Sequence, residues 1–200
     1  MTDMNFDYDL YVLGAGSGGV RASRMAAARG ARVAVAEHDR LGGTCVNLGC
    51  IPKKLMVYAS ALPDACADGV GYGFEAVTPR HNWRSLIEAK DRELQRLNGI
   101  YKRMLEQAGV DIHHGQARLV DAHTVETEGK RFRAKHILIA VGGWPSLPDF
   151  PGAELVSSSN EMFALPERPG RIAVIGGGYI ALEFAGVFHG LGSKVHLLYR

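Results

Sequence analysis

Two cysteines five positions apart are the residues in this sequence most suited to chemistry. Cys45 and Cys50 lie in GGTCVNLGCIPKK, which spans residues 42–54. Such a pair can form a structural disulfide, supply half of a metal site, or open and close as a redox disulfide. A metal site needs more ligands, and Cys66 is the only other cysteine in the sequence. A disulfide across four residues removes little entropy from the unfolded chain, so a redox disulfide is favoured over a structural one.

A glycine motif precedes this pair. Gly14, Gly16 and Gly19 form G-x-G-x-x-G directly after the apolar run 10–13. The first glycine permits a tight turn, the second lets a pyrophosphate approach the backbone, and the third lets helix and strand pack closely. Glu37 ends the following apolar run, where a carboxylate can accept a ribose hydroxyl. The motif predicts a dinucleotide site, with a glycine-rich turn that binds nothing as the alternative.

The same pattern recurs at a constant offset of 162 residues. Gly176, Gly178 and Ala181 form G-x-G-x-x-A after the apolar run 172–175. Each copy reads as a strand, a glycine turn, an alanine-rich helix and a second strand. Two copies of this length are too few for a solenoid and instead predict two dinucleotide-binding βαβ units.

The second copy differs from the first at the end of its last strand. Tyr199 occupies the position that matches Glu37, and Arg200 follows it. A basic residue there suits a 2′-phosphate, so NADP is favoured over NAD. An ordinary solvated arginine is the alternative interpretation.

Composition is typical of a globular protein with a substantial core. The 200 residues are 46% hydrophobic and 22% charged, and the net charge is +2, which gives no electrostatic case for nucleic acid. No apolar run approaches the roughly 20 residues needed to cross a bilayer, so no membrane partner is expected. The acidic N-terminus does not resemble a signal peptide, and we expect a cytoplasmic protein.

The segment between the two copies contains further predicted elements. Residues 50–62 are expected to be helical, and 78–109 contain a long amphipathic helix that ends at Gly109. A polar turn at Glu128–Gly129 precedes an alternating, then apolar, strand. Three prolines in WPSLPDFPGAE indicate a linker.

We therefore expect an α/β protein with a Rossmann-like fold and a parallel sheet, followed by the start of a second dinucleotide-binding βαβ unit. The predicted domains are residues 1–145, which carry the disulfide, and residues 146–200, an incomplete nicotinamide-nucleotide domain.

The motif at 42–54 closely resembles the redox-active disulfide motif of the flavoprotein disulfide reductases. The resemblance extends over essentially the whole chain and is strongest to the glutathione reductases. The stretches that carry this narrower resemblance are residues 14–24, 96–101, 141–152 and 176–186. It implies FAD in the first unit, NADPH in the second, oxidised glutathione as substrate, and a homodimer.

The resemblance also implies which residues contact the cofactors. FAD contacts are expected at Gly14, Gly16, Ser17, Gly18, Gly19, Glu37, Gly43, Thr44, Cys45, Lys53 and Gly142. NADPH contacts are expected at Gly176, Gly178, Tyr179, Ile180, Glu183 and Arg200, with Tyr179 covering the nicotinamide pocket. A tyrosine packed in the core is the alternative for Tyr179.

Four residues are expected to be catalytic. By resemblance, Cys50 is the charge-transfer thiol beside the flavin, and Cys45 is the interchange thiol that attacks the substrate disulfide. Lys53 resembles the lysine near the flavin N5, and Glu183 its ion-pair partner. The spacing alone leaves open whether Lys53 or the adjacent Lys54 faces the flavin.

Ser17, Arg24 and Tyr101 match the glutathione-contact positions. Oxidised glutathione is a small polyanion, and Arg21 and Arg24 suit its carboxylates better than cationic trypanothione. An exposed helix arginine and a core tyrosine are the alternatives. A trypanothione, mercuric or dihydrolipoamide reductase, or a truncated flavin-binding protein without turnover, remain competing functions.

Two features depart from the family pattern. Val141 stands where threonine is frequent, so one hydrogen bond on the flavin side is expected to be missing. The family's general acid is a histidine near the C-terminus, donated by the partner subunit and paired with a glutamate. We expect none of the eight histidines here to take that role, and expect the chain to be the N-terminal portion of a longer reductase.

Overall fold

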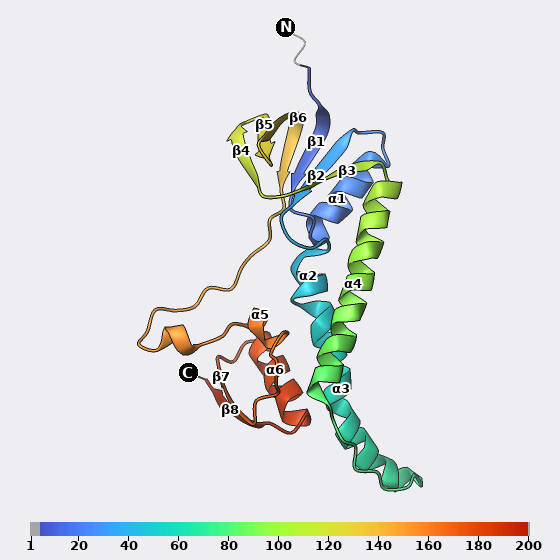
Figure 1. Cartoon of the computed structure of the whole chain (residues 1–200), viewed down its shortest axis with the longest axis vertical. Helices are drawn as coiled ribbons and strands as arrows, with labels where there is room; N and C mark the ends of the chain where they lie inside the picture. Colours follow the sequence, from blue (N-terminus) through green and yellow to red (C-terminus); the bar gives the residue numbers. More distant parts are fainter. Residues whose placement is uncertain (1–4, 200) are drawn as a thin grey trace. The chain divides into compact units, whose positions relative to one another are not determined.

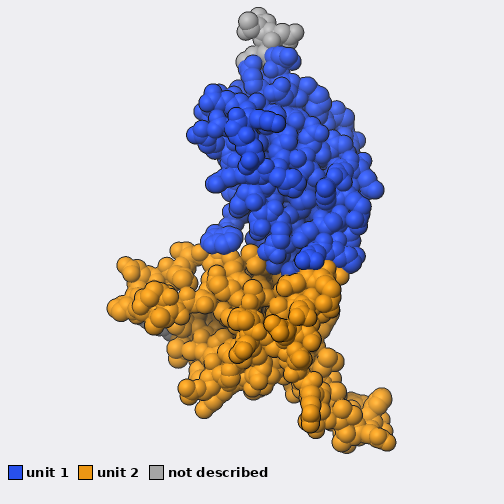
Figure 2. All heavy atoms as spheres, viewed as in Figure 1, with its two compact units in different colours: residues 1–47, 94–144 blue, residues 48–93, 145–200 orange. Residues whose placement is uncertain are grey.

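The computed structural model describes residues 5–199, which form two compact units. One unit consists of Met1–Asn47 and Leu94–Trp144, and the other of Leu48–Glu93 and Pro145–Arg200. Figure 2 colours the residues of each unit. The predicted domain boundary after residue 145 stays a prediction.

The first unit is built on a mixed six-stranded sheet with the order β3-β2-β1-β6-β5-β4 (Figure 1). The strands are β1 (Tyr8–Leu13), β2 (Val33–Glu37), β3 (Val110–His114), β4 (Ala117–Asp121), β5 (Thr124–Thr127) and β6 (Lys130–Ile139). The first three strands and β6 are parallel, whereas β4 and β5 extend the sheet as an antiparallel meander. The expected α/β fold with a parallel sheet is confirmed.

One face of this sheet packs against helices. Helix α1 (Ser17–Ala27) connects β1 to β2, and the later turns of α4 (Trp83–Gln107) lead into β3. Every residue of β2 is buried, as expected for a central parallel strand covered on both faces. Val12 and Val35 form a core with Leu105 of α4, and Tyr101 and Met104 pack at its margin. The predicted amphipathic helix is thus present within residues 78–109.

The opposite face holds a second core around Tyr11. The small residues Ala34 and Ala36 of β2 leave room for this ring, and Val125 of β5 and Phe132 of β6 pack nearby. The meander contains the predicted polar turn, where Glu128 and Gly129 have φ values of 49° and 71°. Positive φ at both central residues is the type I′ geometry that suits a two-residue hairpin.

The second unit combines helices with a parallel strand pair. Its elements are α3 (Cys50–Gly69), η1 (Val70–Tyr72), the first turns of α4, η2 (Ala153–Leu155), α5 (Ser159–Met162), β7 (Arg171–Ile175), α6 (Tyr179–Gly190) and β8 (Lys194–Leu198). Strands β7 and β8 pair in parallel around α6, which gives the predicted second βαβ unit. Phe184 and Phe188 of α6 pack with Met56 and Trp83 to form its core.

Helix α3 differs from its prediction in length. It continues through Pro63 to Gly69, whereas the sequence predicts helix only over 50–62. A proline removes one backbone donor and disfavours helix, but flanking turns can carry the helix past it. None of the helices within residues 5–199 is both long and apolar enough to span a membrane.

Candidate functional site

The glycine turn after β1 is shaped by close backbone contacts. Gly14 has φ +98°, and a Cβ there would lie 2.4 Å from the carbonyl oxygen of Ala140. A Cβ on Gly19 would lie 1.8 Å from the carbonyl oxygen of Gly14. The first and third glycines of the motif therefore permit the tight turn and the packing of α1 against it.

The start of α1 suits an anionic group. Gly16 is its N-cap residue, with no side-chain cap and no acidic residue in the first turn among the residues described. A Cβ on Gly18 would meet open space. Uncapped N–H groups at a helix N-terminus favour a phosphate, so these residues fit the pyrophosphate of a dinucleotide. That Gly14, Gly16, Ser17, Gly18 and Gly19 contact FAD stays a prediction.

Glu37 ends β2 directly beside this turn. Its Oε2 accepts a hydrogen bond from the Ala15 N–H at 2.8 Å, and its Oε1 accepts one from the Asp39 N–H at 3.0 Å. The side chain is buried, and the ring of His38 lies 3.4 Å from Oε1. These bonds fix the carboxylate at the turn, and its remaining lone pairs can accept a ribose hydroxyl.

The segment that carries Cys45 lies against the same turn. Helix α2 (Gly43–Asn47) contains Gly43, Thr44 and Cys45, the residues expected to reach the flavin. A Cβ on Gly43 would lie 2.6 Å from the Cα of Gly16, so the two glycine backbones pass in close contact. The Gly42 N–H also donates to the Ala15 carbonyl at 2.8 Å. The second glycine of the motif thus has a structural partner that the sequence pattern does not reveal.

Cys50, Lys53 and Glu183 belong to the other unit. Lys53 Nζ lies 2.7 Å from Glu183 Oε1, and each side chain is about one-third exposed. The hydrogen bond to Glu183 raises the pKa of Lys53, and the charge of Glu183 adds to this effect, while partial desolvation opposes it. The resemblance implied this ion pair, and the structure contains it; the contact of Lys53 with a flavin stays a prediction.

The adjacent lysine has different surroundings. Lys54 Nζ lies 5.4 Å from the centroid of the Tyr58 ring, in a cation–π contact. Lys53 is therefore the lysine of this pair that contacts Glu183. Cys50 begins helix α3 and is exposed, and Cys45 in the first unit is half-buried. The pairing of the two cysteines stays a prediction.

The second glycine turn is more open than the first. Gly176 has φ +117°, and a Cβ on Gly176 or Gly178 would meet no atom within 4 Å. Tyr179 and Ile180 begin α6 and are both exposed. The ring of Tyr199 lies beside Gly177, since a Cβ there would be 2.3 Å from the ring. Arg200, on which the preference for NADP was based, lies outside the described residues.

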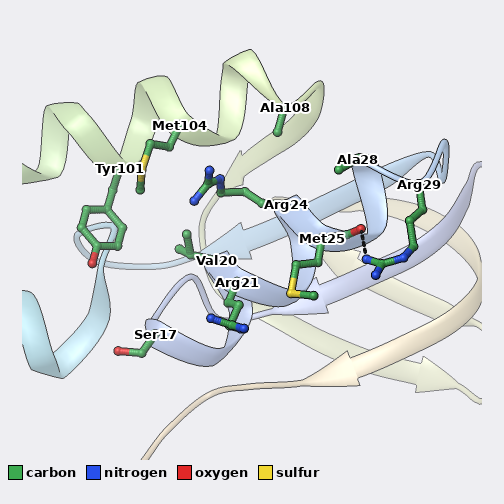
Figure 3. Close-up of a pocket in the computed structure, with 10 residues that line it drawn as sticks. All are labelled: Ser17, Val20, Arg21, Arg24, Met25, Ala28, Arg29, Tyr101, Met104 and Ala108. Atoms are coloured by element: carbon green, nitrogen blue, oxygen red, sulfur yellow. Dashed lines mark hydrogen bonds between the residues drawn. The ribbon is translucent and has the colours of Figure 1, made fainter.

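A hollow between α1 and α4 gathers the residues expected to bind substrate (Figure 3). Ser17, Arg21 and Arg24 line it from α1, and Tyr101 lines it from α4. Its volume is about 620 Å³. Within the described part of the chain, no carboxylate pairs with the guanidinium of Arg21 or Arg24. Two cations one helical turn apart repel each other, so the hollow favours a ligand that brings negative charge.

Gly142 and Val141, the residues expected on the flavin side, lie just after the end of β6. Gly142 has φ +73° and follows Val141, which is exposed. Their relation to a flavin stays a prediction.

No group of three or more potential metal ligands occurs among residues 5–199.

Sequence reasoning missed Asn47 and Asn98. Asn47 is buried, with its amide group surrounded by the carbonyl oxygens of its own loop, and Asn98 reaches it from α4. Asn98 lies in RLNGIY and Asn47 in the cysteine motif, but neither residue type nor spacing signals their contact.

The fold and the two glycine turns are typical of the α/β proteins built from βαβ units of the Rossmann type. A family model described as pyridine nucleotide-disulphide oxidoreductase matches residues 8–200. The chain belongs to this family.

Curated relatives give a narrower similarity. The chain is 50% identical, over 98% of its length, to "Glutathione reductase, chloroplastic/mitochondrial" of Pisum sativum and covers 37% of that protein. It is 51% identical to a glutathione reductase of Burkholderia cepacia and 52% identical to one of Nostoc sp., over 98% of its own length and 43% of each relative. The chain thus spans about two-fifths of the length of these relatives.

Proposed function

We propose that this chain carries the flavin-binding and thiol part of an NADPH-dependent glutathione-disulfide reductase. The structural observation that carries the proposal is the hollow between α1 and α4, where two guanidinium groups face a space suited to a small polyanion. The similarity to proteins named glutathione reductase supports the same substrate. A cationic disulfide such as trypanothione is disfavoured by Arg21 and Arg24.

The residues around the glycine turns suit the two cofactors. The uncapped start of α1 and the fixed carboxylate of Glu37 would hold FAD, and the second turn at Gly176 and Gly178 would hold NADPH. FAD, when bound, would pass the electrons of NADPH to the Cys45–Cys50 disulfide. Glu183 favours the protonated form of Lys53, which would place a fixed positive charge near the flavin.

The thiol chemistry then follows from two cysteines with different roles. The Cys45 thiolate attacks one sulfur of oxidised glutathione, forming a mixed disulfide and releasing one glutathione thiolate, which takes up a proton. The Cys50 thiolate attacks the Cys45 sulfur, restores the protein disulfide and releases the second glutathione. Two electrons pass from the dithiol to the substrate in each cycle. Ser17 and Tyr101 would orient the substrate by their hydroxyl groups.

Binding of FAD and the placement of Cys50 can be tested together. We expect the chain, loaded with FAD and reduced by dithiothreitol, to show a long-wavelength absorption band between thiolate and flavin. Cys50→Ser should abolish the band, and Cys45→Ser should retain it. Loss of the band in Cys45→Ser alone would reverse the assigned roles, and FAD binding without a band in any variant would contradict the thiol assignment.

Substrate binding is tested by calorimetry. Oxidised glutathione should bind the wild-type chain, and Arg24→Ala and Arg21→Ala should each weaken binding by about 10- to 150-fold, since a charge-assisted hydrogen bond contributes on the order of 1.5–3 kcal/mol. Arg103→Ala is a matched control, because Arg103 is exposed on α4 and is not among the residues that line the hollow. Equal affinity for a cationic disulfide would contradict the proposed substrate class.

A homodimer and a cytoplasmic location belong to the same proposal. The homodimer rests on the resemblance, and the cytoplasmic location rests on the sequence. The names of the relatives do not give an oligomeric state, and one of them names chloroplasts and mitochondria instead of the cytoplasm. Sedimentation of the purified protein and fractionation of the source cells test them.

A further inference from the structure

The loop that carries Cys45 is held by a buried amide. The Asn47 side chain is only 3% exposed. Its Nδ2 lies 3.0 Å from the Gly43 carbonyl oxygen, 3.2 Å from that of Leu41 and 3.4 Å from that of Arg40. One amide group thus donates hydrogen bonds across the turn that leads into α2, and Cys45 lies inside the closed loop.

A second amide attaches this loop to α4. Asn98 Nδ2 donates to the Leu41 carbonyl at 2.8 Å and to Asn47 Oδ1 at 2.9 Å. Asn98 therefore satisfies the acceptor of Asn47 while both amides share the Leu41 carbonyl. Partly buried polar groups of this kind hold one geometry, because each lost bond leaves a partner unsatisfied.

The loop is attached on its other side to the start of α1. The Gly42 N–H donates to the Ala15 carbonyl, and Gly43 passes within contact of Gly16. Ser17 is the next residue after Gly16, and Tyr101 lies one helical turn after Asn98. These two residues line the hollow from its two walls (Figure 3). The segment with Cys45 is thus bonded to both elements that form the hollow.

We propose that Asn47 and Asn98 are positioning residues that hold Cys45 in a fixed relation to the substrate hollow. The proposal rests on the proposed function, in which the hollow binds glutathione disulfide and Cys45 attacks it. Neither asparagine touches the reacting sulfurs in this scheme. They act by keeping the α2 segment joined to α4 and α1, so that the thiol and the hollow keep one geometry.

Thiol alkylation tests the positioning role without turnover. The reduced full chain is treated with iodoacetamide, and the rates at Cys45, Cys50 and Cys66 are followed by peptide mass spectrometry. Asn98→Ala removes both hydrogen bonds to the loop, and we expect the Cys45 rate to rise about five- to tenfold, as expected for the loss of a buried hydrogen bond. The Cys66 rate should change by less than about twofold. Gln95→Ala changes an exposed amide on the same helix and should leave all three rates unchanged.

Several outcomes would overturn the proposal. An unchanged Cys45 rate in Asn98→Ala, or an equal rise at all three cysteines, would show that the amide pair has no specific effect on this thiol. If Asn98→Ala does not fold, Asn98→Ser keeps one donor and should give a smaller rise confined to Cys45.

A second arm separates this proposal from the proposed function. Oxidised glutathione should bind both the wild type and a Cys45→Ser control. In Asn98→Ser, the rate of mixed-disulfide formation at Cys45 should fall by a larger factor than the affinity for oxidised glutathione. A change in alkylation without any binding of glutathione disulfide would leave the positioning role standing and refute the assigned substrate. Equal losses in binding and in mixed-disulfide formation would refute the positioning role.

Discussion

Lys53 and Glu183 are separated by 130 positions in sequence and form an ion pair of 2.7 Å. Both side chains are about one-third exposed, so solvent screens the pair and its contribution to stability is small. Its consequence is chemical, because a neighbouring carboxylate favours the protonated amine. The pair therefore raises the pKa of Lys53 further above its ordinary value and holds the amine beside Glu183, but adds little to the stability of the fold.

Glu183→Gln should lower the pKa of Lys53 toward its ordinary value of 10.5, because the glutamine amide cannot supply the negative charge. The measurement is an NMR titration of the lysine side-chain nitrogens. Lys54, which contacts the Tyr58 ring and not Glu183, is the internal control. An unchanged Lys53 titration would show that Glu183 does not raise the pKa of Lys53 in solution.

Ser23 offers a stability test at the other extreme of exposure. Its side chain is fully buried in α1, and its Oγ has no hydrogen-bond partner among the residues described. Ser23→Ala should raise the free energy of unfolding by about 1 kcal/mol, since it removes a buried hydroxyl without a partner and places a better helix former in α1. Urea unfolding measures the change, with the exposed Ser85→Ala as control. A loss of stability would mean that the hydroxyl is bonded in solution.

Among single residues, the sequence predicts only those that belong to a recognisable motif, in which the residue types and their spacing indicate the role. The glycines of both turns, Glu37 and the two cysteines fall in this class. Asn47 and Asn98 do not, since 51 positions separate them and their contact depends on how α4 packs. Nor could spacing alone distinguish Lys53 from Lys54, because both stand in the first turns of α3.

Side chains of β1 and β3 contact each other across β2, on the face of the sheet that holds Tyr11. The Tyr11 hydroxyl lies 2.7 Å from His113 Nδ1, and the His113 ring stacks on Phe132 with centroids 4.4 Å apart. Tyr8 also approaches His113 and donates to Asp111 at 3.0 Å. Burial lowers the pKa of His113; Asp111 opposes this effect, and Lys130 adds to it. The cluster thus favours a neutral imidazole.

This cluster predicts a pH dependence of stability. Because the folded pKa of His113 lies below the unfolded value of 6.5, the unfolded chain binds more protons in the window between the two values. Stability from this residue is therefore present above pH 6.5 and is lost as the pH falls through 6.5 toward the folded pKa. His113→Asn can still bond to Tyr11 but does not titrate, so its stability should vary less with pH in this window.

Urea unfolding between pH 5 and pH 8 measures both proteins. His136→Asn, the same substitution at an exposed position of β6, is the control. Identical slopes in the wild type and His113→Asn would show that His113 is not the group responsible.

Elements with local signals were predictable, and those set by distant contacts were less so. The β1 turn, α4 and the hairpin at Glu128–Gly129 follow from periodicity and turn chemistry. The order of strands, with β6 beside β1, depends on long-range pairing that no local pattern records. The end of α3 was misplaced because proline is a strong but not absolute signal against helix.

The whole molecule contains one local pattern twice, in two different environments. Each copy pairs two parallel strands around a helix and begins that helix after a glycine turn. The first turn is enclosed by backbone from Ala140 and by the Gly16–Gly43 contact, whereas the second has open space at Gly176 and Gly178. Sequence similarity between the copies therefore does not imply an equal cost of substitution.

Gly14→Ala and Gly176→Ala test this difference. Both glycines have positive φ, so alanine is strained at either by about 1–2 kcal/mol. At Gly14 the new Cβ must also displace the Ala140 carbonyl, so the total cost should exceed about 3 kcal/mol, in the range of severe core substitutions.

Hydrogen exchange of β1–β2 and β7–β8 peptides measures each region without assuming that the chain unfolds as one unit. Gly18→Ala, which meets open space within α1, should leave exchange unchanged or slow it slightly. Equal losses of protection at β1–β2 in Gly14→Ala and at β7–β8 in Gly176→Ala would show that the backbone strain of the turn, and not its enclosure, dominates the cost.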